Sequence, residues 1–184
     1  MNPPLLPLLY AALFLFAYGA IWLSVRNQHS YTGPDFTTIA IVYIAVAVMI
    51  GVAGRVVHGA TAGVSRRSAR KRLAEGAIVA AAYVAAYVFM GALRNDGAGN
   101  AIVYGVFAAT GPLIVVGSVM AAFAAAREVW PSVGLAMAIV AVCTGSAFAG
   151  PIWVWAFAGV GCSVACLVYA AARVWPSRAS TKGI

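Results

Sequence analysis

Charged side chains are scarce along this chain. Only 9% of its 184 residues are Asp, Glu, Lys or Arg, and just 4 of these are acids. A soluble domain carries about a quarter charged residues, so this sequence cannot build the charged shell of a water-soluble fold. With 64% hydrophobic residues and a mean hydropathy of +0.94, the chain is also too apolar to be disordered. These exclusions leave an integral membrane protein.

Ionisable groups are absent from the middle of every apolar run. Such groups are costly inside a bilayer and usually mark proton relays, coupled-ion sites or catalysis. Their absence argues against a carboxylate-driven proton antiporter and against an intramembrane metalloenzyme. His29 and His58 are expected on opposite membrane faces, so they cannot jointly hold a haem or a metal. No Gly-x-Ser-x-Gly, Cys-x-x-Cys or phosphate-loop motif occurs, and we predict no catalytic residue, no cofactor and no metal site.

Cysteine is also rare, and all 3 cysteines lie inside predicted spans. An odd number with none in a loop argues against a disulfide framework. Cys162 and Cys166 are four residues apart and share a helix face, but no His or carboxylate lies nearby to complete a metal site. We interpret them, together with Cys143, as small packing residues.

The apolar residues fall into runs long enough for the helix of about 20 residues that crosses a bilayer. The first run lacks the basic residues that precede a signal-peptide core, so we expect a retained helix. The last charge-free run would form a helix of about 66 Å and must turn back, which Gly150-Pro151 favours. The sequence therefore predicts an all-α membrane protein, a compact bundle of about six transmembrane helices in one domain, 1–184, with spans at about 4–25, 36–57, 73–93, 100–126, 129–149 and 151–173.

Lysine and arginine predict the orientation. The basic loop at 59–72 contains five positive residues and no acid, and positive loops stay on the cytoplasmic side. Both termini are then cytoplasmic, Glu75 lies in the first turn of its span, and Arg26 and Arg94 remain outside, each near an acid. The residues expected to fix topology and contact anionic lipid headgroups are Arg55, Arg66, Arg67, Arg70, Lys71, Arg72, Arg127 and Arg173.

The net charge of +8 lies between apolar spans rather than along one folded face, so we predict no nucleic-acid partner. The lipid bilayer and its anionic headgroups are the expected partners, and a membrane-protein partner or a homo-oligomer stays open. Arginine outnumbers lysine, and alanine, glycine and valine dominate, which is typical of GC-rich bacterial genomes. We therefore expect a multi-pass protein of the bacterial cytoplasmic membrane.

Aromatic and hydroxyl side chains recur in the outer third of all six predicted spans. Pro112 removes a backbone hydrogen bond beside Thr110 and is expected to kink the fourth helix. One interpretation is an aromatic belt with core tyrosines bonded to backbone. The other is an outward-facing cavity for a neutral or weakly polar small molecule. Its lining residues would be Tyr18, Tyr43, Tyr87, Tyr104, Thr110, Thr144, Ser146 and Trp155.

The functional hypothesis is a membrane protein of transport type rather than an enzyme, which binds or passes such a molecule through this cavity. One alternative is a structural or assembly subunit, whose rows of small residues would pack on partner helices. A membrane enzyme acting on lipid or isoprenoid is the remaining alternative. It would need acids or bases that only four carboxylates near the interfaces supply.

Overall fold

A computed structural model describes the backbone of residues 5–60 and 66–179, and the side chains of residues 5–49, 70–71 and 73–173. The all-α prediction is confirmed, because every regular element in these ranges is a helix. The elements are α1 (Leu5–Val25), α2 (Phe36–Ala60), α3 (Arg66–Asn95), the π-helix η1 (Ala101–Phe107), α4 (Ala108–Ala125), α5 (Trp130–Ser146), the 3-10 turn η2 (Ala147–Ala149) and α6 (Gly150–Ala179).

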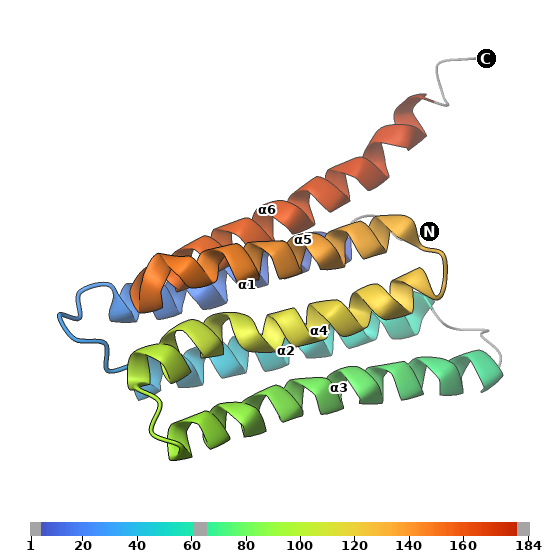
Figure 1. The fold of residues 1–184 in the computed structure, drawn as a ribbon. Coiled ribbons are helices and arrows are strands. Elements are labelled where there is room, and N and C mark those ends of the chain that lie inside the picture. The colour runs from blue at the N-terminus through green and yellow to red at the C-terminus, as the bar shows by residue number, and fades with distance from the viewer. Residues whose placement is uncertain (1–4, 61–65, 180–184) are drawn as a thin grey trace.

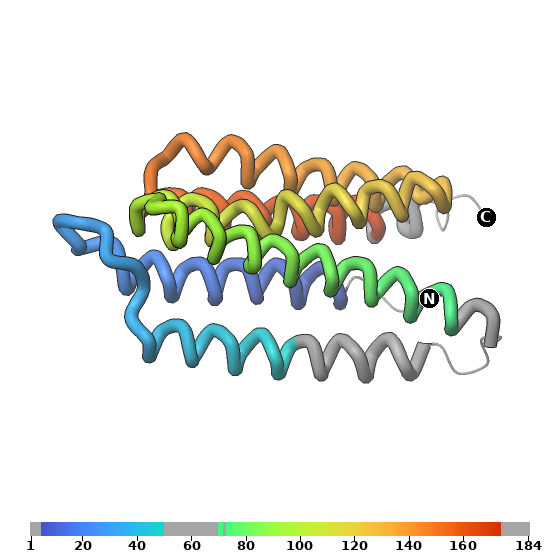
Figure 2. The backbone as a smooth tube through the Cα atoms, turned by 60° about the horizontal axis from the view of Figure 1, so that its bottom comes forward, coloured from blue at the N-terminus to red at the C-terminus, as the bar shows by residue number. Residues whose placement is uncertain are grey.

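Successive long helices run in opposite directions (Figure 1). The starts of α1 and α3, the α4–α5 connection and the end of α6 share one end of the bundle. We call it the basic end. The connections 26–35 and 96–100 and the turn at η2 share the other, which we call the loop end. Helix α6 packs on α1, α5 and η1, whereas α2 packs mainly on α1 and lies at the edge of the bundle (Figure 2).

Within the ranges whose side chains are described, four helical stretches are long and apolar enough to cross a membrane, by length and composition: Leu5–Val25, Leu73–Asn95, Ala101–Ala125 and Trp130–Arg173. The last comprises 44 residues and turns back on itself, so that α5 and α6 pack side by side. The reversal occurs at Gly150, whose φ of 83° a residue without a Cβ adopts readily. The part of α2 whose side chains are described, Phe36–Met49, is apolar as well.

Helix α3 extends beyond the apolar span predicted there. It begins at Arg66, so the second half of the predicted basic loop is helical. Hydropathy marks the segment that prefers lipid, whereas the helix continues because arginine, lysine and alanine are strong helix formers. As a consequence Glu75, expected in a first turn, lies well inside the helix. The side chains of Arg55, Arg66, Arg67 and Arg72 lie outside the described residues.

The kink expected at Pro112 stays a prediction, and the structure shows the π-helix η1 nearby, which ends one turn before this buried proline. There the N–H of Ala108 bonds to the carbonyl of Val103, five residues earlier. Proline has no N–H, and its ring crowds the carbonyl four residues before it, here that of Ala108. A widened preceding turn relieves that crowding, and such π segments occur often at functional sites.

Candidate functional site

Two of the predicted binding residues, Tyr18 and Trp155, meet inside the bundle, toward the loop end. The Tyr18 hydroxyl of α1 donates a hydrogen bond of 2.7 Å to the carbonyl of Ala109 in α4. The ring of Tyr18 also packs against Trp155 of α6, with 5.4 Å between centroids. Trp155 is only 5% exposed. Thr110, which follows Ala109, is 4% exposed, but its hydroxyl donates to the carbonyl of Val106 at 2.8 Å, one turn back along the chain. We refer to Tyr18, Trp155 and the Tyr31 described below as the interior cluster.

A loop residue completes this cluster. The Tyr31 hydroxyl accepts a hydrogen bond of 3.3 Å from the indole Nε1 of Trp155 and donates one of 2.7 Å to the carbonyl of Tyr104 in η1. Tyr31 lies in the polar connection between α1 and α2, and the prediction from sequence missed it. The only signal was a lone aromatic residue in an otherwise polar loop. A single phenol therefore bridges an N–H of α6 and a backbone carbonyl of η1.

The connection that carries Tyr31 is folded on itself. The Gln28 side chain donates to the carbonyl of Gly33 at 2.8 Å and accepts from the backbone N–H of Thr32 at 3.0 Å. Gly33 has a φ of 103°, a left-handed conformation that is strained for any residue with a side chain. The amide of Gln28 thus spans the turn and fixes the backbone on both sides of it, which positions Tyr31 toward the bundle.

Two glycines let the helices approach closely enough to form the cluster. A Cβ at Gly159 in α6 would lie 2.5 Å from the Cβ of Tyr18, and a Cβ at Gly105 in η1 would lie 2.5 Å from the Cβ of Pro151. Two non-bonded carbon atoms cannot approach this closely, because their optimal separation is about 3.5–4.0 Å. The positions of α1 and η1 against α6 therefore depend on the absence of side chains at these two sites.

Beside this cluster lies a hydrogen-bond donor without a partner. Trp22 packs against the core group formed by Ile21, Val25, Ala109, Val154 and Trp155. Its indole Nε1 is buried and has no hydrogen-bond partner among the described residues, and the same holds for the side-chain oxygen of Asn100 at the start of η1. Leaving a buried polar atom unpaired costs about 1–3 kcal/mol, so both atoms favour an additional polar group at the loop end.

Tyr43 and Tyr87, also predicted to bind substrate, form a second group between α2 and α3. The Tyr83 hydroxyl donates to that of Tyr87 at 3.1 Å, with ring centroids 4.9 Å apart, and Tyr43 of α2 interacts with Tyr87 as well. Tyr43 is 57% exposed and Tyr83 41%. Sequence analysis did not select Tyr83, although its spacing of four residues from Tyr87 places both on one helix face.

The remaining predicted lining residues do not join either group through their side chains. The ring of Tyr104 is exposed, and only its backbone carbonyl takes part in the interior cluster. Thr144 is exposed and donates to the carbonyl of Val140 in its own helix. Ser146 is buried and donates to the carbonyl of Cys143. The structure therefore brings together Tyr18 and Trp155, and separately Tyr43 and Tyr87.

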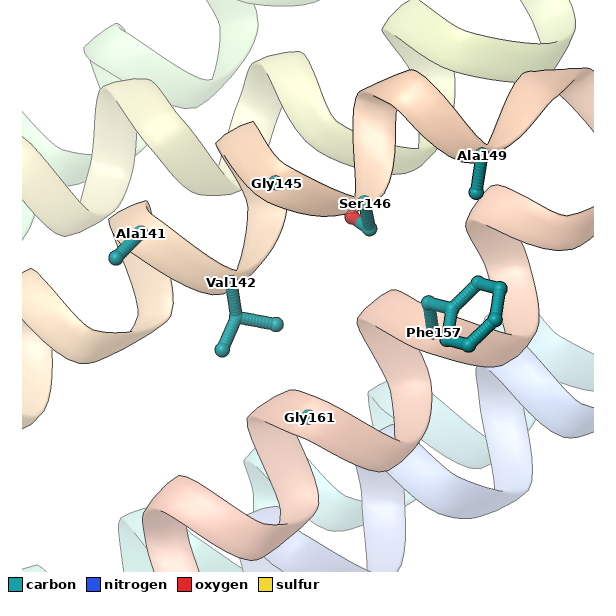
Figure 3. Close-up of a pocket in the computed structure, with 7 residues that line it drawn as sticks. All are labelled: Ala141, Val142, Gly145, Ser146, Ala149, Phe157 and Gly161. Carbon is teal, nitrogen blue, oxygen red and sulfur yellow. The ribbon is translucent and has the colours of Figure 1, made fainter.

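Ser146 instead lines a shallow groove between α5 and α6. The groove has a volume of about 400 Å³. Its walls are formed by small and apolar side chains of both helices: Ala141, Val142, Gly145, Ser146, Ala149, Phe157 and Gly161 (Figure 3). Because the single hydroxyl already bonds to backbone, the groove suits an apolar occupant.

At the basic end, the predicted headgroup residues fall into two kinds. Arg127 forms a salt bridge with Glu75 of α3, and Arg173 donates to the Tyr169 hydroxyl at 2.7 Å while lying over its ring. These guanidiniums are tied to neighbouring side chains. By contrast Arg70 and Lys71 are exposed at the start of α3. This end therefore presents exposed positive charge at Arg70 and Lys71, and paired positive charge at Arg127.

Comparisons of the chain with protein-family models, with curated proteins and with solved structures found no match. The chemistry of the described interior is that of neutral hydrogen bonding. Its buried polar residues are Thr110, Ser146 and Ser163, and no Asp, Glu, His, Lys or Arg is buried in the described ranges. Such a site can orient a neutral molecule through hydroxyl, carbonyl and indole groups.

Proposed function

We propose that this protein crosses the bacterial cytoplasmic membrane six times, with its basic end and both termini in the cytoplasm. The alternating direction of the helices supports this topology, since consecutive connections fall at opposite ends of the bundle. The charge distribution supports the orientation, because positive residues accumulate on the cytoplasmic side of membrane proteins. Arg70 and Lys71 then contact anionic headgroups, a contribution of about 1 kcal/mol for each residue near the surface.

We further propose that the protein is of transport type and that the interior cluster binds a neutral or weakly polar small molecule. The observation that carries this proposal is the Tyr31 phenol, which bridges the Trp155 N–H and the Tyr104 carbonyl. A hydroxyl of a ligand has the same donor and acceptor capacity as this phenol. The loop residue thus occupies the place that a hydroxylated ligand would take, and the conformation seen is the closed one.

The surroundings of that phenol support the same assignment. The π-helix η1 adjoins the cluster, and interrupted helices line the substrate sites of many membrane transporters. The unpaired indole Nε1 of Trp22 offers a further donor at the edge of the same core group. Movement of the 26–35 connection away from the bundle would open a path from the outer side to Trp155.

Ligand-induced thermal stabilisation tests this proposal. The protein in lipid nanodiscs is screened against neutral hydroxylated molecules, namely polyols, cyclic alcohols and phenols. We expect one class to raise the Tm, and Trp155→Phe to weaken its binding about tenfold, as the loss of a hydrogen bond of about 1.4 kcal/mol would. Tyr31→Ala should strengthen binding, because it vacates the site. Tyr169→Phe, at the basic end, is the matched control and should bind like wild type.

The proposal fails if no hydroxylated molecule stabilises the protein. It also fails if Trp155→Phe binds as well as Tyr169→Phe does, because the ligand would then lie elsewhere. Loss of ligand binding in Tyr31→Ala would contradict the role of Tyr31 as an internal occupant.

A second candidate, an assembly subunit of a larger membrane complex, is favoured by the second tyrosine group. Tyr43 and Tyr83 are about half exposed within their helices, and polar groups at such positions stabilise helix association in membranes. Purification under native conditions separates the candidates. A stable heteromeric complex that dissociates on Tyr43→Phe supports assembly, whereas an isolated bundle supports ligand binding.

A further inference from the structure

Two of the three cysteines meet across a helix interface. The Sγ atoms of Cys143 in α5 and Cys162 in α6 lie 3.9 Å apart, and both residues are 0% exposed. This pairing differs from the one that the sequence suggests, because Cys162 and Cys166 share a helix face whereas Cys143 comes from the neighbouring helix. Cys166 is buried as well, at 2% exposure.

We propose that Cys143 and Cys162 form a dithiolate site for a soft divalent cation that accepts two ligands, with Hg(II) as its representative. The site is independent of the ligand proposed above, because it lies between α5 and α6 and shares no residue with the interior cluster. Thiolate sulfur is the preferred ligand of soft metal ions.

The distance between the sulfur atoms suits chelation. Metal–thiolate bonds are about 2.3 Å long, so two sulfurs 3.9 Å apart subtend an angle of about 116° at a shared ion. A linear arrangement needs a separation of about 4.6 Å, which is about 0.7 Å more. Rotation about the single χ1 of each cysteine supplies such a shift without moving either helix backbone.

The number of ligands selects the kind of metal. Among the described residues, no group of three or more His, Cys, Asp or Glu side chains is arranged to hold a metal ion. Zinc takes four ligands in structural sites and at least three protein ligands in catalytic ones, so two sulfurs do not satisfy it. A cation that binds only two ligands can be fully coordinated by these two sulfurs.

The charge of the cation also determines which soft metal ions fit the two thiolates. Two thiolates and a divalent cation form a neutral unit, whereas two thiolates and a monovalent cation leave one negative charge. An uncompensated charge in a low-dielectric interior costs several kcal/mol. Binding of HgCl2 is then an exchange in which two S–H and two Hg–Cl bonds break and two S–Hg bonds form. Two protons and two chloride ions leave, with no change of oxidation state.

The groove between α5 and α6 lies beside the two cysteines, although neither of them lines it. It is lined by Val142 and Gly161, the immediate neighbours of Cys143 and Cys162 (Figure 3). Its walls are apolar, which matches neutral complexes such as HgCl2 that enter lipid. Close packing keeps the site narrow, since a Cβ at Gly161 would lie 2.5 Å from a methyl of Val142. A neutral two-coordinate complex in the groove would therefore reach the buried thiols when α5 and α6 separate locally.

Intact-protein mass spectrometry tests this site. Full-length protein in detergent is reduced with a phosphine, freed of reductant, given one equivalent of HgCl2 and washed with glutathione at about 1 mM, the effective-concentration range of a short tether. We expect wild type to retain one mercury with loss of two protons. Cys143→Ser and Cys162→Ser should lose the metal at about 100-fold less glutathione, because one thiol cannot chelate.

Cys166→Ser is the matched control, since it removes a buried thiol one turn along the same helix, and it should retain mercury like wild type. A second readout needs no variant: a chelate joins α5 to α6, so mercury should raise the Tm of wild type. The proposal is overturned if glutathione strips wild type and the variants equally. Retention that depends on Cys166, or loss of two protons without metal, which indicates a disulfide, overturns it as well.

Discussion

The contact between η1 and α6 gives the sharpest prediction about stability, through the substitution Gly105→Ala. A Cβ at this position would lie 2.5 Å from the Cβ of Pro151, 3.0 Å from its Cα and 3.3 Å from its carbonyl oxygen. These neighbours are a locked ring and backbone, so no flexible side chain can give way. The two helices would have to separate by about 1 Å to restore normal carbon–carbon distances.

The magnitude follows from comparison with a glycine in open space. Overpacking of this kind costs about 1–3 kcal/mol. Alanine also gains up to about 1 kcal/mol of helix propensity over glycine, which offsets part of that cost. Gly134→Ala in α5 has the same gain and meets nothing within 4 Å, so the difference between the two variants isolates the contact.

The assay is equilibrium unfolding in mixed micelles with increasing SDS, followed by tryptophan fluorescence. We expect Gly105→Ala to be about 1–3 kcal/mol less stable than Gly134→Ala. Far-UV circular dichroism of both variants before unfolding checks that each retains its helices. Equal stability of the two variants, or a more stable Gly105→Ala, would show that η1 and α6 do not approach as described.

Three other perturbations have defined outcomes. Hydrogen bonds from the hydroxyl and the N–H of Thr38 hold the pKa of Asp35 below its usual 3.8, so this cap stabilises the start of α2 above that pH. The contribution is lost as the pH falls through the folded-state pKa of Asp35. Hydrogen exchange of the Thr38 amide, corrected for its intrinsic rate, should therefore lose protection below about pH 3.8. Unchanged protection in that range would refute the cap. A double-mutant cycle of Glu75→Gln and Arg127→Gln should give a coupling of about 0.2–1 kcal/mol in SDS unfolding, and zero coupling would contradict the salt bridge. Ser163→Ala should cost about 0.6 kcal/mol, because its hydroxyl bonds to a carbonyl of α1, and a neutral effect would contradict that contact.

The helices were predictable from the sequence because their apolar residues occur in long uninterrupted runs. Hydropathy does not give helix ends, and α3 shows why. Its first residues are basic yet helix-forming, so the helix starts at Arg66 while the apolar run starts at Leu73. Similarly, the sequence predicts a distortion near Pro112, but the length of the π segment before it depends on how η1 packs against α6.

Which side chains meet was less predictable. In a soluble helix, apolar periodicity identifies the buried face, but a membrane helix is apolar on all sides. Thr144 and Ser146 therefore looked equivalent in the sequence, although the structure exposes the first and buries the second. The contact of Tyr31 with Trp155 joins residues 124 positions apart, and that of Cys143 with Cys162 joins two helices. No local pattern records either contact.

The central claim, a six-span bundle with its basic end in the cytoplasm, is tested most directly by labelling of intact bacterial cells with a membrane-impermeant maleimide. Single cysteines are introduced at exposed positions of the connections, by Asn27→Cys, Asp96→Cys and Glu128→Cys, while the native cysteines are buried and give the background in unsubstituted protein. The account predicts that Asn27→Cys and Asp96→Cys react in intact cells and that Glu128→Cys reacts only after permeabilisation. Labelling of Glu128→Cys from outside, or of neither loop-end position, would contradict it.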